Sequence, residues 1–240
     1  MPFGGKHQQT LMEGSVQTLP ILHAKNVETV SFASWGFDAE ISEQNPMIGA
    51  SLAVVESVAK IVAMGGNYQN IRLSFQEYFE KLGDNPEKWG KPLAALLGAY
   101  DAQMKLGLAA IGGKDSMSGT YLDINVPPTL ISFACANGEK SNVISPEFKK
   151  AGNFIYHFQH KILDNGLPNY DELIEVFQFI LDQIQTEKII SAKTIKEGGI
   201  AVALAKMCFG NRVGAEICVD KETLFSKNIG SFVIESVEKL

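Results

Sequence analysis

Residues 111–121 contain the side chains best suited to holding an anion, in the order Ile-Gly-Gly-Lys-Asp-Ser-Met-Ser-Gly-Thr-Tyr. Glycine allows backbone amides to approach a phosphate closely, and Lys114 can place a positive charge beside it. The spacing differs from that of a Walker A loop and from that of a dinucleotide-binding fingerprint. The residues alone predict a tight polar turn between a helix and a strand. A ligand-binding loop and a plain structural turn both fit this pattern.

Composition places the chain among globular proteins and narrows its partners. With 240 residues, 45% hydrophobic and 20% charged, it has room for one large domain or two small ones. A net charge of −6 excludes a general attraction to nucleic acid or to an anionic membrane. The sequence shows no signal peptide and no apolar run of about 18 residues that would span a membrane. The three cysteines lie in apolar runs, which predicts buried, reduced thiols in a cytoplasmic protein.

Hydrophobic periodicity predicts alternating strands and helices before residue 137. The predicted strands are 27–33, 71–75 and 129–136, and the predicted helices are 50–64 and 92–106. Gly65-Gly66 and Gly107 are expected to end the two helices. The stretch from Gly36 to Pro46 is polar and is expected to form turns.

A polar stretch at 137–150 predicts a domain boundary. Beyond it we expect a strand at 153–158, a long core helix at 171–187, an extended segment at 189–192, a helix ending near Cys208, and strands at 215–219 and 230–235. This alternation predicts an α/β or α+β fold. The expected domains are a flexible segment 1–26, an N-terminal domain 27–145 and a C-terminal domain 146–240.

Several short motifs occur together in a specific order along residues 27–236. They include Gly36-Phe37-Asp38-Ala39, Ala53 to Lys60, Arg72 to Phe79, Gly112 to Ser118, Val126 to Leu130, and Gly198-Gly199-Ile200 through Met207. In this combination the chain resembles the second synthetase-like half of the large phosphoribosylformylglycinamidine synthases. These enzymes belong to the aminoimidazole ribonucleotide synthetase superfamily.

The resemblance implies a two-subdomain fold, whose N-terminal sheet-plus-helices domain pairs into a barrel and whose C-terminal α/β domain is incomplete. It implies a fragment of a cytoplasmic, ATP-dependent amidotransferase of purine biosynthesis, inactive alone. The expected partners are the first synthetase-like half and the glutaminase domain. Because strand edges left unpaired are adhesive, we expect the isolated chain to form a homodimer. A non-catalytic scaffold, an auxiliary nucleotide-binding half and a stand-alone synthetase or kinase of the superfamily are the alternatives.

By resemblance, the loop around Lys114 faces the first half across a shared active site. Gly113 is then expected near the nucleotide, and Ser116 is expected to bind the ribonucleotide substrate. Lys114 occupies the position of a metal-binding asparagine in smaller relatives, next to Asp115. The alternative is that Asp115 and Ser118 only cap the turn through local hydrogen bonds.

A second set of residues corresponds to an auxiliary site that holds magnesium and ADP or ATP in large relatives. The corresponding positions here are Asp38 with Ala39 beside it, Glu56, Lys60, Thr194 and Lys196. Lysine and threonine replace two expected oxygen ligands, and magnesium needs octahedral oxygen coordination. We therefore hypothesise a metal-free site in which Lys60 is ion-paired with Asp38 and Glu56. The alternatives are an ordinary Glu56–Lys60 surface pair and magnesium bound by Asp38 and Glu56.

Overall fold

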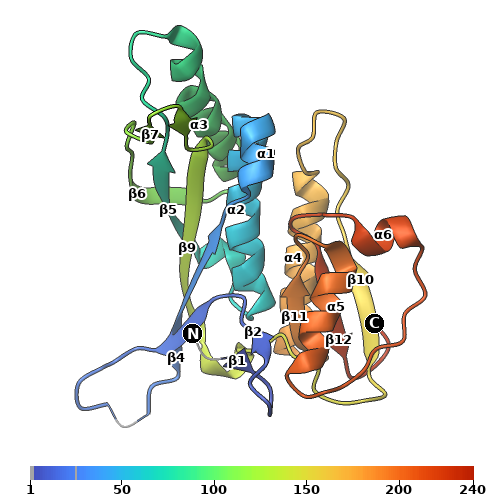
Figure 1. Cartoon of the computed structure of the whole chain (residues 1–240). Coiled ribbons are helices and arrows are strands. Elements are labelled where there is room, and N and C mark those ends of the chain that lie inside the picture. The colour runs from blue at the N-terminus through green and yellow to red at the C-terminus, as the bar shows by residue number, and fades with distance from the viewer. Residues whose placement is uncertain (1–2, 25) are drawn as a thin grey trace.

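Two β-sheets lie on either side of a long central helix in the computed structural model, which describes residues 3–24 and 26–240 (Figure 1). The larger sheet has the strand order β3-β4-β9-β5-β6, with β3 (Ser15–Thr18), β4 (Thr29–Gly36), β9 (Thr129–Glu139), β5 (Arg72–Tyr78) and β6 (Ala109–Lys114). Only the β5–β6 pair is parallel; the other pairs in this sheet are antiparallel. The smaller sheet has the order β10-β12-β11, all antiparallel, with β10 (Phe154–Phe158), β12 (Phe232–Ser236) and β11 (Ile189–Thr194). These features confirm the predicted mixed α/β class.

The central helix α2 (Pro46–Ala63) begins where the local sequence favours a helix start. The Asn45 side chain accepts hydrogen bonds from the Met47 and Ile48 amides, and Pro46 occupies the first turn, where no amide donor is needed. Gly65, with φ of +92°, follows the helix end. Contrary to our expectation, α2 is apolar and long enough to cross a membrane. However, 83% of it is buried inside the protein, as befits a core helix.

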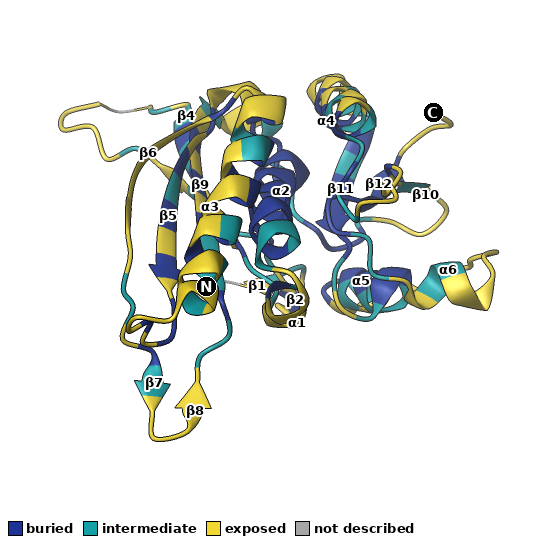
Figure 2. Cartoon of the chain, turned by 90° about the horizontal axis from the view of Figure 1, so that it is seen from above, coloured by how far each residue is buried: buried dark blue, intermediate teal, exposed yellow. Residues whose placement is uncertain are grey.

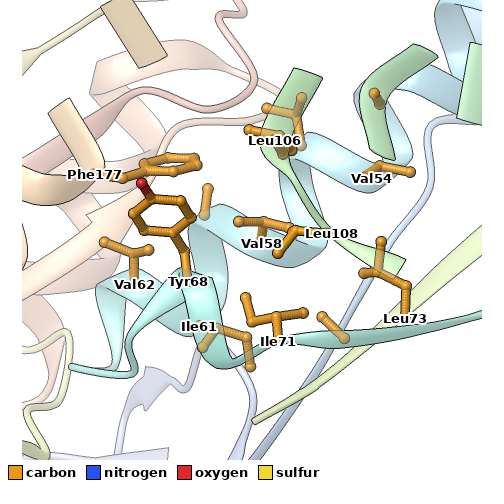
Figure 3. Packing of buried hydrophobic residues seen from close by; sticks show 14 of the residues in the cluster. Val54, Val58, Ile61, Val62, Tyr68, Ile71, Leu73, Leu106, Leu108 and Phe177 are labelled. Carbon is orange, nitrogen blue, oxygen red and sulfur yellow. The ribbon is translucent and has the colours of Figure 1, made fainter. Parts of the chain in front are cut away.

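The hydrophobic core is continuous from the larger sheet, through α2, to the helix α4 (Tyr170–Gln185). Figure 3 shows Val62 of α2 near Tyr68, whose ring lies beside that of Phe177 of α4. The centroids of these two rings are 5.8 Å apart, and Phe177 also meets Phe232 of β12 edge-on at 5.9 Å. The parts of the chain on either side of the predicted boundary at residues 137–150 therefore share one hydrophobic core. The predicted domain limits remain predictions.

Helix starts account for two differences from the predicted elements. Asp38 caps the short helix α1 (Ala39–Gln44), which lies within the stretch expected to form turns. Helix α3 (Pro86–Leu106) begins at Pro86 instead of Pro92, because Asn85 caps it and Pro86 fits the first turn. Gly107, with φ of +66°, ends α3 as predicted.

The C-terminal part follows the prediction except at 215–219 and at one short helix after it, which we did not predict. The helices here are α4, α5 (Gly199–Phe209) and α6 (Lys221–Phe225). Residues 215–219 form no strand, and Ile217 and Val219 are exposed. An alternating apolar pattern is insufficient where no neighbouring strand supplies hydrogen-bond partners.

Residues 1–26 were expected to be flexible, but part of this segment forms strands and packs against the rest of the chain. They form β1 (Phe3–Gly4), β2 (Thr10–Leu11) and β3, which joins the larger sheet. Thr10 is buried and donates its hydroxyl to the Lys206 carbonyl in α5. Residues 1, 2 and 25 of the predicted flexible segment lie outside the described residues.

Helices cover one face of the larger sheet and leave the other face open (Figure 2). Side chains alternate along β4 and β9, so Trp35, Phe133 and Cys135 are exposed while Phe32 and Ala134 are buried. This corrects the prediction that the cysteines are buried. Cys135 and Cys218 are exposed and Cys208 is half-buried, and all three are free thiols. An apolar strand does not require both faces of its sheet to be covered.

Candidate functional site

The glycine-lysine stretch begins as an edge strand, not as the tight turn that we predicted. In β6, Gly113 pairs with Phe75 and Lys114 with Gln76 of β5. A Cβ atom on Gly113 would lie 2.7 Å from the Phe75 carbonyl oxygen, whereas one on Gly112 would meet open space. Glycine at 113 therefore allows the edge strand to approach β5 closely.

Two backbone hydrogen bonds anchor the polar loop that follows β6. The Phe79 amide donates to the Ser116 carbonyl, and the Gly119 amide donates to the Phe79 carbonyl, both at 2.9 Å. The Ser116 and Ser118 hydroxyls lie 2.9 Å apart. Among the described residues, the side chains of Lys114 and Asp115 have no hydrogen-bonded or ionic partner. The two serines thus bond to each other, while the lysine and the carboxylate are free to bind a ligand.

Glu77 is a functional candidate that sequence reasoning did not select. It is buried in β5 near the loop, and burial together with the negative charge of Asp115 raises the pKa of its carboxyl group. Two neighbouring carboxylates, one of which favours protonation, can hold or exchange a proton there.

In the central helix α2, the carboxylate of Glu56 is shared by two lysines. Its Oε1 lies 2.6 Å from Lys60 Nζ and 2.6 Å from Lys196 Nζ, and its Oε2 accepts a hydrogen bond from the Phe37 amide. Lys60 also donates to the Trp35 carbonyl at 2.8 Å and lies 4.6 Å from the centroid of that indole ring. The predicted pairing of Lys60 with Glu56 is present. It is buried, so it differs from an ordinary surface pair.

Asp38 takes a different partner from the one in our hypothesis. Its Oδ2 lies 2.7 Å from Lys227 Nζ, not Lys60, and its Oδ1 caps α1 by accepting from the Ile41 amide. Lys227 also contacts Glu197 at 2.6 Å. Ala39 is exposed at the first position of α1 and does not line the pocket described below.

The residues do not fit a magnesium ion. Lysines already contact the carboxylates of Glu56 and Asp38, and no group of three or more metal-binding side chains occurs in residues 3–24 and 26–240. A divalent cation between these lysines would face direct electrostatic repulsion.

Thr194 and Lys193 of β11 both contact Glu13, which the sequence analysis missed because it lies in the segment expected to be flexible. Thr194 donates its hydroxyl to Glu13 Oε2, and Lys193 Nζ is ion-paired with Oε1. Burial would raise the pKa of Glu13, but Lys193 and Thr194 outweigh it and hold that pKa below its usual value. The N-terminal segment thus supplies an ionised carboxylate beside Thr194.

These groups surround a cavity of about 530 Å³ between β3, β4, β11 and α5. The cationic side chains that line it are Lys60, Lys193, Lys196 and Lys206. Glu13 neutralises Lys193, while Lys60 and Lys196 share Glu56, and Lys206 has no carboxylate partner among the described residues. Burial lowers the pKa of Lys60, which Glu56 only partly offsets, and burial and Lys193 lower the pKa of Lys206. Four lysines and two carboxylates, Glu13 and Glu197, line the cavity, so its lining has more cationic than anionic side chains in a chain that is negative overall. The lowered pKa values of Lys60 and Lys206 reduce this excess.

One aromatic surface and one helix end complete the cavity. The Trp35 ring lies beneath Lys60 and Lys196, and its exposed face is large enough to stack against a planar group. Gly199, the first residue of α5, also lines the cavity, and no side chain caps that helix. Lysines, a helix N-terminus and an indole ring are together suited to a phosphate-bearing planar ligand.

The chain has an aminoimidazole-ribonucleotide-synthetase-like fold. The structure of PurLQS from Thermotoga maritima superposes with a TM-score of 0.72 over 94% of this chain and 38% of that chain, at 14% identity. Thermotoga maritima PurL complexed with ATP gives 0.71 over 98% of this chain and 39% of that chain, also at 14% identity. At such identities the likeness establishes the fold.

The proteins that match this chain in sequence include phosphoribosylformylglycinamidine synthase subunits PurL. The chain is 23% identical over 222 residues to that of Pyrobaculum aerophilum and 26% identical over 215 residues to that of Leuconostoc mesenteroides. These matches cover 81% and 79% of this chain but only 31% and 28% of the relatives, so the chain spans less than a third of their length. No protein-family model matches the chain. The resemblance expected from the motifs is confirmed.

Proposed function

We propose that the chain is one synthetase-like half of a cytoplasmic, ATP-dependent carbon–nitrogen ligase. The enzyme would convert formylglycinamide ribonucleotide to formylglycinamidine ribonucleotide in purine biosynthesis, with glutamine as the amide donor. The match to PurL subunits over about four fifths of the chain carries this proposal. The remaining synthase domains, namely the first synthetase-like half and a glutaminase domain, are the proposed partners.

The loop following β6 would complete an active site shared with the first half. In such a ligase ATP activates the formyl amide oxygen, and ammonia then displaces phosphate, so the site must neutralise charge and exclude water. Lys114 would stabilise negative charge on the phosphoryl group, Gly113 would bring the backbone close to the nucleotide, and Ser116 would bind the substrate. Support comes from the position of the loop at the outer edge of the sheet, where Lys114 and Asp115 are exposed. No described segment closes over this edge, so the chain alone would be inactive.

The lysine-lined cavity would serve as an auxiliary nucleotide site that binds ADP or ATP without magnesium. Lys60 and Lys196 would supply the positive charge that a metal supplies elsewhere, and Trp35 would contact the base. The neighbour complexed with ATP supports a nucleotide ligand for this fold. The alternative function, a half whose role is structural or limited to auxiliary nucleotide binding, is favoured by one observation: four lysines of this chain line the cavity, whereas Lys114 and Asp115 in the loop are exposed.

Calorimetric titration with ADP and ATP, with magnesium or with a chelator, tests the auxiliary site. We expect equal affinity in both buffers, and an affinity about tenfold lower, or about 1.4 kcal/mol, in Lys60→Ala and Lys196→Ala. Lys188→Ala, which removes a lysine from an exposed pair with Glu238, is the matched control and should bind as the unmodified chain does. Binding that requires magnesium would refute the metal-free site.

Reconstitution with the remaining synthase domains tests the composite active site. We expect ADP release that depends on formylglycinamide ribonucleotide and ammonia only when both parts are present. Lys114→Ala should lower kcat while leaving nucleotide binding to the lysine-lined cavity intact, and Lys140→Ala serves as the control. Full activity of Lys114→Ala would remove the loop from the proposed chemistry.

A further inference from the structure

We propose that Lys193 and Thr194 form a phosphate subsite of the lysine-lined cavity, which the carboxylate of Glu13 fills in the free chain, an inference that rests on the nucleotide-binding role proposed above. Three donors converge on this carboxylate. The Thr194 hydroxyl and, at 3.3 Å, the Thr194 amide donate to Oε2, and the Lys193 ammonium donates to Oε1. An amide, a hydroxyl and an ammonium group are equally the donors that hold a phosphate.

The N-terminal segment is held in place on both sides of Glu13 by other contacts. On one side the buried Thr10 donates its hydroxyl to the Lys206 carbonyl, and on the other side Ser15 pairs with Ala33 of β4. The Glu13 carboxylate can therefore leave the subsite by rotation of its own side chain while the backbone stays where it is. Exchange of this carboxylate for a ligand phosphate requires no unfolding of the segment.

Lys206 supplies positive charge that Glu13 does not neutralise. It lines the same cavity, and within residues 3–24 and 26–240 no carboxylate is ion-paired with it. Burial and the positive charge of Lys193 lower the pKa of Lys206, so an anion between the two ammonium groups would relieve their repulsion. When both lysines are protonated, one carboxylate leaves them with one positive charge. A phosphate group carries about two negative charges near neutral pH and matches this pair better.

The subsite adjoins the lysines already proposed to bind the ligand. Lys193, Thr194 and Lys196 all line the cavity, and at most about 7 Å of extended backbone separates Thr194 from Lys196. A diphosphate can contact both positions, with one phosphate at Lys196 and Lys60 and the other in the place of Glu13. The expected ligand is therefore a nucleoside that carries at least two phosphates.

Calorimetric titration with ADP tests the competition. Glu13→Gln removes the competing charge but keeps the side-chain length, and it should bind ADP about tenfold more tightly than the unmodified chain. Glu197→Gln is the matched control, because Glu197 also lines the cavity but its side chain is 75% exposed. Loss of this solvent-screened charge should change the affinity by less than about twofold. Equal gains in the two variants would indicate a general effect of charge and overturn the subsite.

Two further variants keep the test decisive if Glu13→Gln folds poorly. Glu13→Asp keeps the charge but shortens the side chain by one methylene group, so it should also bind ADP more tightly, although less so than Glu13→Gln. Adding Thr194→Val to either variant removes a donor of the subsite and should abolish most of the gain. A gain that survives Thr194→Val would refute the subsite.

Failure of the subsite differs from failure of the nucleotide site. Equal ADP affinities of the unmodified chain, Glu13→Asp and Glu13→Gln would overturn the subsite and leave the proposed nucleotide site standing. Absence of ADP binding in all three chains would overturn both.

Discussion

Lys196 Nζ lies 2.6 Å from Oε1 of Glu56, joining the loop before α5 to the middle of the central helix α2. Glu56 is almost fully buried and also holds Lys60, so one carboxylate organises two lysines at the floor of the cavity. The Glu56–Lys196 ion pair links the position of a loop in the C-terminal part to the core of the N-terminal part. The stability of the chain and the charge of the cavity therefore depend on the same carboxylate.

Glu56→Gln should strongly destabilise the chain. The buried Lys60 ammonium would lose its counter-charge, and breaking a buried ion pair typically costs about 3–5 kcal/mol. Urea unfolding measures the change. Glu56→Gln combined with Lys60→Met should recover most of the loss, because no buried charge is then left uncompensated and Lys196, which also loses Glu56, is partly exposed. Lys196, whose side chain is 33% exposed, should matter less, and Lys196→Ala should cost under about 1 kcal/mol.

Glu13 should make the stability depend on pH in the acidic range. Its pKa is lower in the folded chain than the ordinary value of 4.5, so the unfolded state binds the proton more readily. The stabilising contribution is therefore present above that ordinary value and is lost as the pH falls toward the folded pKa. Urea unfolding between neutral and acidic pH should show this decline. Glu13→Gln should be less stable at neutral pH and show a shallower decline, and an unchanged slope would contradict the role of Glu13.

Asp115→Asn should lower the pKa of Glu77. Burial and the negative charge of Asp115 raise that pKa, so the fold favours protonated Glu77, and this contribution is lost as the pH rises through the folded pKa. Removing the Asp115 charge weakens the second cause and should stabilise the chain near neutral pH. NMR titration of the Glu77 carboxyl carbon measures the shift. Asp123→Asn, in the turn between the short strands β7 (Thr120–Tyr121) and β8 (Ile124–Asn125), is the control and should leave the Glu77 titration unchanged.

Gly113→Ala and Gly112→Ala should differ although the residues are adjacent. The added methyl at 113 would lie 2.7 Å from the Phe75 carbonyl oxygen, whereas the methyl at 112 would meet open space. Overpacking of this kind costs about 1–3 kcal/mol, so Gly113→Ala should unfold at lower urea concentration. Gly112→Ala should unfold as the unmodified chain does. Equal stability of the two variants would show that β6 separates from β5 at little cost.

The elements that depend on neighbours in sequence could be predicted. Apolar periodicity predicted the helices α2 and α4, and Gly107 predicted the end of α3, without knowledge of the fold. The pairing of Glu56 with Lys60 was also predictable, because residues separated by four positions face each other on a helix. The missed start of α3 had a local signal in Asn85-Pro86, which the sequence analysis did not use.

Only the tertiary structure determined which distant groups meet. The sequence contains Glu13 and Lys227 as ordinary polar residues, and nothing local selects Thr194 and Asp38 as their partners. The family resemblance placed Lys196 and Glu56 at one site but did not predict their ion pair. Likewise, the glycine-lysine stretch becomes a strand because β5 offers it a parallel edge. Helical contacts repeat within a few residues and leave a periodic trace in the sequence. Partners brought together by chain topology leave none, because their proximity depends on how all the intervening elements pack.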